Sequence, residues 1–438
     1  MKSIIIALSK IGQFILKKLG RGSSFPGVFA LKLDKNILGK FKLPRITICI
    51  TGTTGKTSIT TTLASIYEQA GYKVGTNNKA SNLIFGVTSL FIEHSDLRGN
   101  IKSDVLIVEV DERYVKKVFK YFKPNYFIVN NLSRDQMARN GHYDIVWKEI
   151  NNSITDDIHL ILNADDPLIY KLSLKHKGKV TYYGLKQNEY SSLENIGTLD
   201  LSYCPICHKK LEFDYFNYGN LGKYHCSNND FNRPKIEDES ELIDDNTFKI
   251  DDQEIHLSNN ALYNIYNLSA CYVAAKETGI KREDISKYLN NLSVKIKRLE
   301  EFKIGEKEVV LTLSKNDTPS SYNSSIDYVI KQPEKKTVIL GFNTISIMYN
   351  IKDISWMYDV NFELLRESNI EKIICTGKFA TNIATRLKYA DIDMGKIEII
   401  PDSTKIIEII KEKTIGKIYL VFPFDMEEYF RELIKRGV

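Results

Sequence analysis

A glycine-rich turn near residue 50 carries the residue types that bind phosphate. Residues 51–58 read TGTTGKTS and lie between an apolar run and a helical pattern. Backbone N–H groups of such a turn, with the positive end of the following helix, form a site for anions. Lys56 would place a positive charge on the outer phosphates of a nucleotide, and Thr57 a hydroxyl on Mg²⁺. The pattern predicts an ATP and Mg²⁺ site made by Gly52, Thr53, Thr54, Gly55, Lys56, Thr57 and Ser58.

Polar residues further along the chain have spacings that suit the same ligand. Glu109 ends an apolar run, where its carboxylate could simply face solvent. Asn264 and Asn267 are three residues apart in a helical pattern, so their amides share one helix face and could both reach the edge of a base. The same amides could instead be capping or surface residues.

Apolar runs that alternate with helical patterns must position these groups. Strands that alternate with helices predict a parallel sheet with helices on both faces, so the expected fold class is α/β. The predicted strands are residues 45–50, 105–110, 126–129 and 159–162, and, after the alternation restarts at residue 309, residues 338–340, 373–376 and 418–422.

The 438 residues suggest two or three domains. We expect an N-terminal helix with the segment leading into the first domain (1–40), an ATP-binding α/β domain (41–300), a cysteine-containing ribbon inserted in it (201–236) and a C-terminal α/β domain (301–438). With 43% hydrophobic and 26% charged residues, the composition excludes a disordered or collagenous chain. The net charge of +6 permits anionic ligands or an anionic membrane surface but does not indicate nucleic-acid binding. Six cysteines fit a reducing cytosol better than a disulfide scaffold.

The first 19 residues predict an amphipathic helix. Its apolar residues recur every three or four positions, at Ile4, Leu8, Ile11, Ile15 and Leu19. No small-residue cleavage site follows, which argues against a signal peptide. Two interpretations remain: the helix packs on its own domain, or it rests on a membrane surface.

The phosphate turn resembles that of the Mur ligase superfamily. Its first glycine is Gly52, whereas position 50, where a strict P-loop has glycine, is Ile50. Segments 163–167 (NADDP), 263–267 (YNIYN) and 298–300 (RLE) resemble further family motifs in the same order. The resemblance implies a P-loop ATPase domain of the Mur ligase type. It also implies Mg²⁺ at Thr57 and Glu109, and nucleotide contacts by Asn264, Asn267 and Arg298.

Other segments narrow the resemblance to the MurT family. These are residues 109–112 (EVDE), 131–136 (NLSRDQ) and 353–363 (DISWMYDVNFE). Members are the Mur-ligase-like subunits that amidate D-glutamate in lipid II. The resemblance implies that ATP phosphorylates the α-carboxylate of D-glutamate and that ammonia then attacks the acyl phosphate to give D-isoglutamine. It implies cytoplasmic action at the inner face of the membrane.

The resemblance also implies a partner subunit. Ammonia would come from glutamine hydrolysed by GatD, a class I amidotransferase. An aspartate of the ligase subunit would complete the Cys–His pair of the partner, with Asp353 as first choice and Asp359 as second. Asp135, in the 131–136 motif, is a further candidate catalytic residue. Asp353 could instead be a helix N-cap.

The cysteine segment departs from the family pattern of two Cys-x-x-Cys pairs, which is typical of a zinc ribbon. Cys204, Cys207 and Cys226 are present, but the fourth position is Asn229. Three interpretations stay open: zinc with a substituted ligand, a metal-free ribbon, or substrate binding through free thiols. The nearby substitute ligands are His208, His225 and Asp230.

Two other functions compete with amidation. Residues 315–323 and 341–344 depart from the family motifs, which suggests a catalytically weakened relative that serves as a binding subunit. Another amino-acid ligase of the superfamily, similar to folylpolyglutamate synthase, is the second alternative. Segments 131–136 and 353–363 argue against it.

Overall fold

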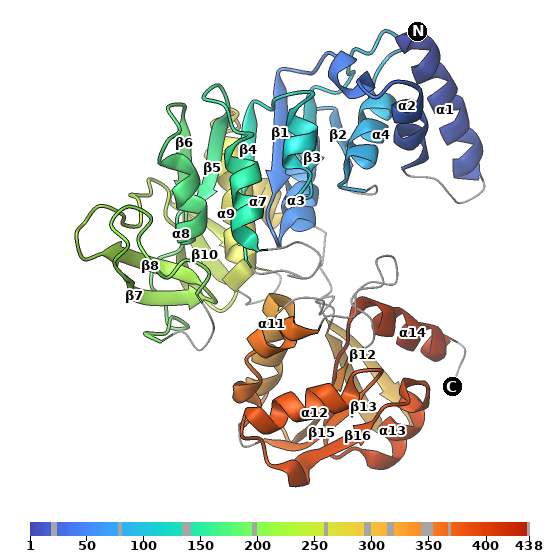
Figure 1. The fold of residues 1–438 in the computed structure, drawn as a ribbon, viewed down its shortest axis with the longest axis vertical. Coiled ribbons are helices and arrows are strands. Elements are labelled where there is room, and N and C mark those ends of the chain that lie inside the picture. Colours follow the sequence, from blue (N-terminus) through green and yellow to red (C-terminus); the bar gives the residue numbers. More distant parts are fainter. Residues whose placement is uncertain are drawn as a thin grey trace. The chain divides into compact units, whose positions relative to one another are not determined.

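The computed structural model forms two compact units, each described by itself (Figure 1). The first comprises Met1–Ser133, Tyr143–Asn195 and Leu199–Lys295, and the second Arg134–His142, Ile196–Thr198 and Ile296–Val438. The structure describes residues 1–18, 24–77, 81–133, 142–194, 199–257, 262–292, 299–312, 319–342, 354–366 and 369–435.

A six-stranded parallel sheet forms the centre of the first unit, with the order β2-β3-β1-β4-β5-β6. Its strands are β1 (Ile46–Thr51), β2 (Val74–Thr76), β3 (Val105–Glu109), β4 (Tyr126–Val129), β5 (His159–Asn163) and β6 (Val180–Tyr183). The four strands predicted in this region are confirmed as β1, β3, β4 and β5. The α/β fold class is likewise confirmed.

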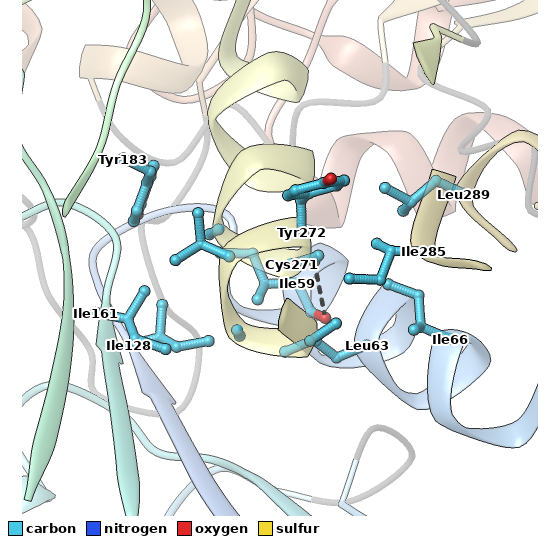
Figure 2. Close-up of a cluster of buried hydrophobic side chains, with 14 of the residues drawn as sticks. Ile59, Leu63, Ile66, Ile128, Ile161, Tyr183, Cys271, Tyr272, Ile285 and Leu289 are labelled. Carbon is cyan, nitrogen blue, oxygen red and sulfur yellow. Dashed lines mark hydrogen bonds between the residues drawn. The ribbon is translucent and has the colours of Figure 1, made fainter. Parts of the chain in front are cut away.

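Helices cover both faces of this sheet because its central strands are apolar on both sides. On one face, alternate strand residues such as Ile128 and Ile161 pack against α3 (Lys56–Gln69) and α9 (Leu262–Glu277), and α10 (Arg282–Asn290) extends that layer (Figure 2). The opposite face packs against α4 (Ile84–His94), α5 (Val115–Phe119), α7 (Tyr143–Asn151) and α8 (Pro167–Tyr170), which η2 (Lys171–Ser173) follows.

Two small antiparallel sheets interrupt the α/β pattern. A hairpin of β7 (Leu211–Tyr218) and β8 (Leu221–Cys226) lies within the predicted ribbon. A three-stranded sheet follows, made of β9 (Glu241–Asp244), β10 (Thr247–Ile250) and β11 (Gln253–His256). This three-stranded sheet was not predicted from the sequence.

The chain begins with α1 (Lys2–Lys18), α2 (Phe25–Leu33) and the short helix η1 (Ile37–Lys40). The amphipathic helix predicted at the N-terminus is therefore present. It packs on its own unit, but through Ile5 and Ile6 rather than through the predicted apolar face. Ile4 and Leu8 of that face are exposed to solvent.

The second unit is a three-layer α/β domain. Its sheet has the order β12-β13-β17-β14-β15-β16, in which β12 and β13 are antiparallel and the remaining neighbours are parallel. The strands are β12 (Leu299–Ile304), β13 (Lys307–Thr312), β14 (Lys336–Gly341), β15 (Ile370–Thr376), β16 (Ile397–Ile400) and β17 (Lys417–Val421). The strands predicted at 338–340, 373–376 and 418–422 correspond to β14, β15 and β17.

Helices cover both faces of the second sheet. One face packs against α11 (Pro319–Ile330), η3 (Ser355–Asp359), η4 (Phe362–Arg366) and α12 (Ala380–Tyr389). The other packs against α13 (Ile406–Lys413) and α14 (Phe424–Lys435). The short helices η5 (Met394–Lys396) and η6 (Ser403–Lys405) precede β16 and α13.

Candidate nucleotide and metal sites

The phosphate turn connects the end of β1 to the start of α3, as the sequence predicts. Gly52 and Gly55 have φ values of +146° and +84°, which favour glycine. A Cβ atom at Gly55 would lie 2.3 Å from Oδ1 of Asn267 and 2.5 Å from Nδ2 of Asn130. Glycine is therefore required there both by the backbone conformation and by the close approach of two amide side chains.

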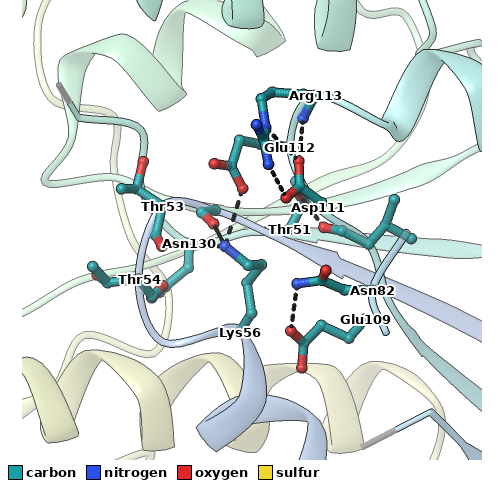
Figure 3. Close-up of polar contacts among 12 residues, drawn as sticks. Thr51, Thr53, Thr54, Lys56, Asn82, Glu109, Asp111, Glu112, Arg113 and Asn130 are labelled. Atoms are coloured by element: carbon teal, nitrogen blue, oxygen red, sulfur yellow. Dashed lines mark hydrogen bonds and ion pairs between the residues drawn. The ribbon is translucent and has the colours of Figure 1, made fainter. Parts of the chain in front are cut away.

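Lys56 lies inside the turn and points to its carbonyl groups. Its Nζ donates hydrogen bonds to the carbonyl oxygens of Gly52 and Thr53, and it is 3.0 Å from Oε2 of Glu112 (Figure 3). Burial alone would lower the pKa of Lys56, but the negative charges of Glu112, Asp111 and Glu109 outweigh it and raise the pKa. The ammonium group is therefore held in its charged form next to the turn.

The two predicted Mg²⁺ ligands lie next to each other. Oγ1 of Thr57 donates to Oε2 of Glu109 at 2.9 Å, and Nδ2 of Asn82 donates to the other carboxylate oxygen at 3.1 Å. Glu109 is the last residue of β3, and β3 is the neighbour of β1. A hydroxyl at the start of α3 and a carboxylate at the carboxyl end of the strand beside β1 suit Mg²⁺ beside a nucleotide phosphate.

The residues after β4 support the turn from the other side. Nδ2 of Asn130 donates to the carbonyl of Thr54 at 3.2 Å and to Oδ1 of Asn267 at 3.0 Å. Oδ1 of Asn131, the first residue of the 131–136 motif, accepts the N–H of Thr54 at 2.9 Å. Asn130 was not among the predicted site residues, although its place directly after a predicted strand was a usable signal.

Of the two asparagines predicted on α9, Asn267 is tied to the turn through Asn130. Asn264 is also buried, one helical turn earlier on the same helix. The helix thus brings one predicted residue to the phosphate turn, and the contact of Asn264 with a base stays a prediction. Arg298, the third predicted nucleotide contact, lies outside the described residues.

The 163–167 motif forms a buried polar network instead of an open site. Oδ1 of Asp166 accepts the N–H groups of Leu168 and Ile169 and so caps α8. Burial raises the pKa of Asp166 to about 7. Oδ1 of Asp165 accepts a hydrogen bond from Nε of Arg233 at 2.7 Å, which ties the ribbon to the central sheet.

Cys204 and Cys207, which precede β7, lie beside Cys226 at the end of β8, and Asp230 joins them. Oδ1 of Asp230 is 3.2 Å from Sγ of Cys204 and 3.6 Å from Sγ of Cys207, and the sulfurs of Cys207 and Cys226 are 3.3 Å apart. One ligand atom from each of the four residues lies within 4.8 Å of the others. Among the substitutes considered from sequence, the structure places Asp230 in the cluster.

The other two substitutes, His208 and His225, are not part of this cluster. His225 is on the opposite side of β8 from Cys226, because successive strand residues alternate between faces. Its Nδ1 is 3.1 Å from a carboxylate oxygen of Asp214. His208 is exposed and adopts a positive φ of 62°. Asn229, at the fourth family position, also has a positive φ, of 57°.

In the second unit, the 353–363 segment contributes to packing and to an ion pair. Trp356 is buried against Phe342. Glu363 pairs with the buried Arg386 through both carboxylate oxygens, at 2.8 and 2.9 Å. Asp359 ends η3 and is partly exposed. Asp353 and Asp135 lie outside the described residues.

Comparison with known proteins gives consistent matches along the chain. Residues 50–275 match the model of the Mur ligase middle domain, and residues 313–424 match that of the MurT ligase C-terminal domain. The chain is 30% identical to the MurT subunit of lipid II isoglutaminyl synthase (glutamine-hydrolyzing) of Staphylococcus aureus (strain COL), over 89% of this chain and 88% of that protein. It is 28% identical to the same subunit of Streptococcus pneumoniae (strain ATCC BAA-255 / R6), over 96% and 94%.

A solved structure shares the fold. The pseudomurein peptide ligase type C from Methanothermus fervidus superposes with a TM-score of 0.69 at 20% identity, covering 92% of this chain and 81% of that chain. At this identity the likeness establishes the architecture alone.

Proposed function

The chain belongs to the MurT family of Mur ligases, and from this premise we propose that it activates the α-carboxylate of D-glutamate in lipid II with ATP for amidation to D-isoglutamine. The observation that carries the proposal is the cluster of Lys56, Thr57 and Glu109 at the carboxyl ends of two adjacent strands. This cluster stands in a chain that matches MurT proteins over nine-tenths of its length.

The proposed reaction has two steps. A carboxylate oxygen of D-glutamate attacks the γ-phosphorus of ATP, and the bond to ADP breaks. Ammonia then attacks the acyl carbon, phosphate leaves with the bonding electrons, and the amide nitrogen loses a proton. Lys56 stays charged because of Glu112 and would stabilise negative charge on the transferring phosphoryl group. Mg²⁺, when bound, would be held by Thr57 and Glu109 and would neutralise further phosphate charge.

A zinc ion fits the cysteine cluster. Zinc–sulfur bonds of about 2.3 Å and zinc–oxygen bonds of about 2.0 Å place tetrahedral ligands roughly 3.5–3.8 Å apart. The separations of 3.2–3.6 Å between the Asp230 oxygen and two of the sulfurs come close to this. Backbone N–H groups of Ile206 and Cys207 donate to Sγ of Cys204. We therefore propose Cys204, Cys207, Cys226 and Asp230 as a structural site, since four protein ligands close the tetrahedron.

The ammonia source in the proposal is a GatD-type glutaminase. A carboxylate that orients a catalytic histidine serves the glutaminase step alone, because it fixes the tautomer and stabilises the imidazolium. The resemblance of segment 353–363 to MurT supports Asp353 in this role, with Asp359 as the alternative. Asp135 remains a candidate in the ligase reaction.

The function is tested by amidation of lipid II in the presence of the glutaminase, ATP and either glutamine or ammonium. We expect the wild-type protein to use both nitrogen donors, and Asp353→Asn to keep ammonium-dependent amidation while losing the glutamine-dependent reaction. Loss of both activities in this variant would place Asp353 at the ligase site or in the fold. Retention of both would transfer the role to Asp359.

The same assay separates the competing functions. Addition of a whole amino acid, independent of glutamine and ammonium, would identify a different ligase. Absence of ATP turnover with the partner present would identify a binding subunit. Either result would refute the proposed amidation.

A further inference from the structure

Helix α1 exposes a continuous apolar face to solvent. Five of its apolar side chains are about half exposed or more: Ile4 at 64%, Leu8 at 47%, Ile11 at 57%, Phe14 at 63% and Ile15 at 53%. Four of these recur every three or four residues, so they lie on one side of the helix. An apolar surface of this kind on a folded protein marks an interaction site.

The opposite side of α1 is fixed to the rest of the unit. Ile5 and Ile6 are buried in a cluster with residues of α2 and α4. Nζ of Lys10 donates to the carbonyl of Ser95 at 2.5 Å. A Cβ atom at Gly12 would lie 2.8 Å from the ring of Phe25 in α2, so the two helices approach closely there. These contacts hold α1 with its more apolar side outward, at the edge of the unit (Figure 1).

The charge of α1 indicates what covers this face. The helix contains lysines but no acidic residue. Its sequence carries Lys2, Lys10, Lys17 and Lys18, and Arg21 follows. Lys2 and Lys10 donate to the carbonyl oxygens of Lys40 and Ser95 on the packed side of the helix. A helix with exposed apolar side chains, several lysines and no acidic residue suits the headgroup region of an anionic bilayer. A second copy of the chain is disfavoured as the occupant, because two such helices would bring lysines together with no acidic partner on either helix.

We infer that α1 binds the surface of an anionic phospholipid bilayer through Ile4, Leu8, Ile11, Phe14 and Ile15. Within the part of the chain that the structure describes, no helix is long and apolar enough to span a bilayer. The inference rests on the proposed function in one respect: because lipid II is anchored in the membrane, binding to the membrane surface would bring the enzyme to its substrate. Binding would confine the enzyme to the layer in which that substrate lies.

The experiment is sedimentation of the full chain, with its glutaminase partner, on vesicles of phosphatidylglycerol and phosphatidylcholine or of phosphatidylcholine alone. We expect the wild-type protein to bind the anionic vesicles, and L8Q/I11Q to bind them at least about tenfold more weakly because two large apolar side chains are lost from the interface. Both residues are exposed, so the double variant should fold. A matched control, I145Q/L174Q, alters side chains of similar exposure, 57% and 41%, outside α1 and should bind like the wild type.

Amidation measured in parallel separates this inference from the proposed function. We expect L8Q/I11Q to amidate lipid II normally in detergent and slowly on vesicles. Amidation in detergent without vesicle binding by the wild type would overturn the inference and leave the function intact. Vesicle binding that needs Leu8 and Ile11, without any amidation, would support the inference and refute the function.

Three further results would overturn the inference. One is equally tight binding to neutral vesicles. Another is a wild-type dimer that L8Q/I11Q dissociates, with no vesicle binding. The last is loss of vesicle binding when the glutaminase is added, since the partner would then cover α1.

Discussion

The phosphate turn and the cysteine cluster lie in the same unit but are held in different ways. The turn receives contacts from Glu112 after β3, Asn130 after β4 and Asn267 on α9. The cysteine cluster is local, because all four of its candidate ligands lie within residues 204–230. A site assembled from distant elements fixes each residue through several partners. In a local site, a residue at the neighbouring position can take over the role of a lost ligand, and Asp230, next to Asn229, is placed among the three cysteines for that role.

The largest effect on activity is expected when the phosphate turn loses the positive charge of Lys56. Lys56→Ala should lower ATP turnover on the order of 10³-fold, because the transferring phosphoryl group loses its positive partner. The variant should also be less stable, since it leaves the buried carboxylate of Glu112 without its ion pair. Both quantities are measured, by ATP hydrolysis with the partner and by thermal unfolding.

A compensating variant separates the two effects of Lys56→Ala. Lys56→Ala combined with Glu112→Gln should regain stability without regaining turnover. Lys116→Ala is the matched control, because it breaks an exposed pair with Glu149 and should change neither quantity. Normal ATP turnover in Lys56→Ala would contradict the assigned nucleotide site.

The fold was predictable where strands are fully buried. The strands β1, β3, β4 and β5 are mostly apolar and almost wholly buried, and the sequence shows their apolar residues directly. The strand β2 has three residues and β6 has mostly half-buried ones, so neither produces a clear pattern. The three-stranded sheet of β9 to β11 is largely polar, and its pairing depends on turns that periodicity does not reveal.

The site residues were likewise predictable only where a local sequence pattern identifies them. Lys56, Thr57 and Glu109 could be proposed from sequence because a short motif and a strand end identify them. The support that Asn130 gives to the turn depends on how β4 lies beside β1, which no local pattern contains. At the cysteine cluster, sequence spacing pointed to position 229 and left three substitutes open. The geometry of the hairpin was needed to place Asp230 among the sulfurs.

Substitutions of Asp230 test the proposed zinc site, and we expect their effect to be smaller than that of Lys56→Ala. Asp230→Asn should weaken zinc binding at least about 100-fold, because losing a group that only supports a ligand already costs 10–100-fold. Asp230→Cys should bind zinc more tightly than the wild type, and ATP turnover should change in neither variant. Competition with a chromophoric chelator measures the affinity. His225→Ala is the control and should keep its zinc, so loss of zinc there but not in Asp230→Asn would reverse the assignment.

The smallest effect on ligand binding should come from the two asparagines of α9, of which Asn267 contacts the phosphate turn through Asn130. Asn267 contacts Asn130 and closes on Gly55, so Asn267→Ala should loosen the turn and weaken binding of any polyphosphate about tenfold, the cost of roughly one buried hydrogen bond. Asn264, as the candidate for the base, should affect only ligands that carry adenine. Isothermal titration with ATP and with inorganic tripolyphosphate compares the two variants.

We expect Asn267→Ala to lose affinity equally for both ligands, and Asn264→Ala to lose affinity for ATP alone. If Asn267→Ala instead impairs ATP alone, its amide reads the base, and the turn is held by Asn130 and Asn131 without it.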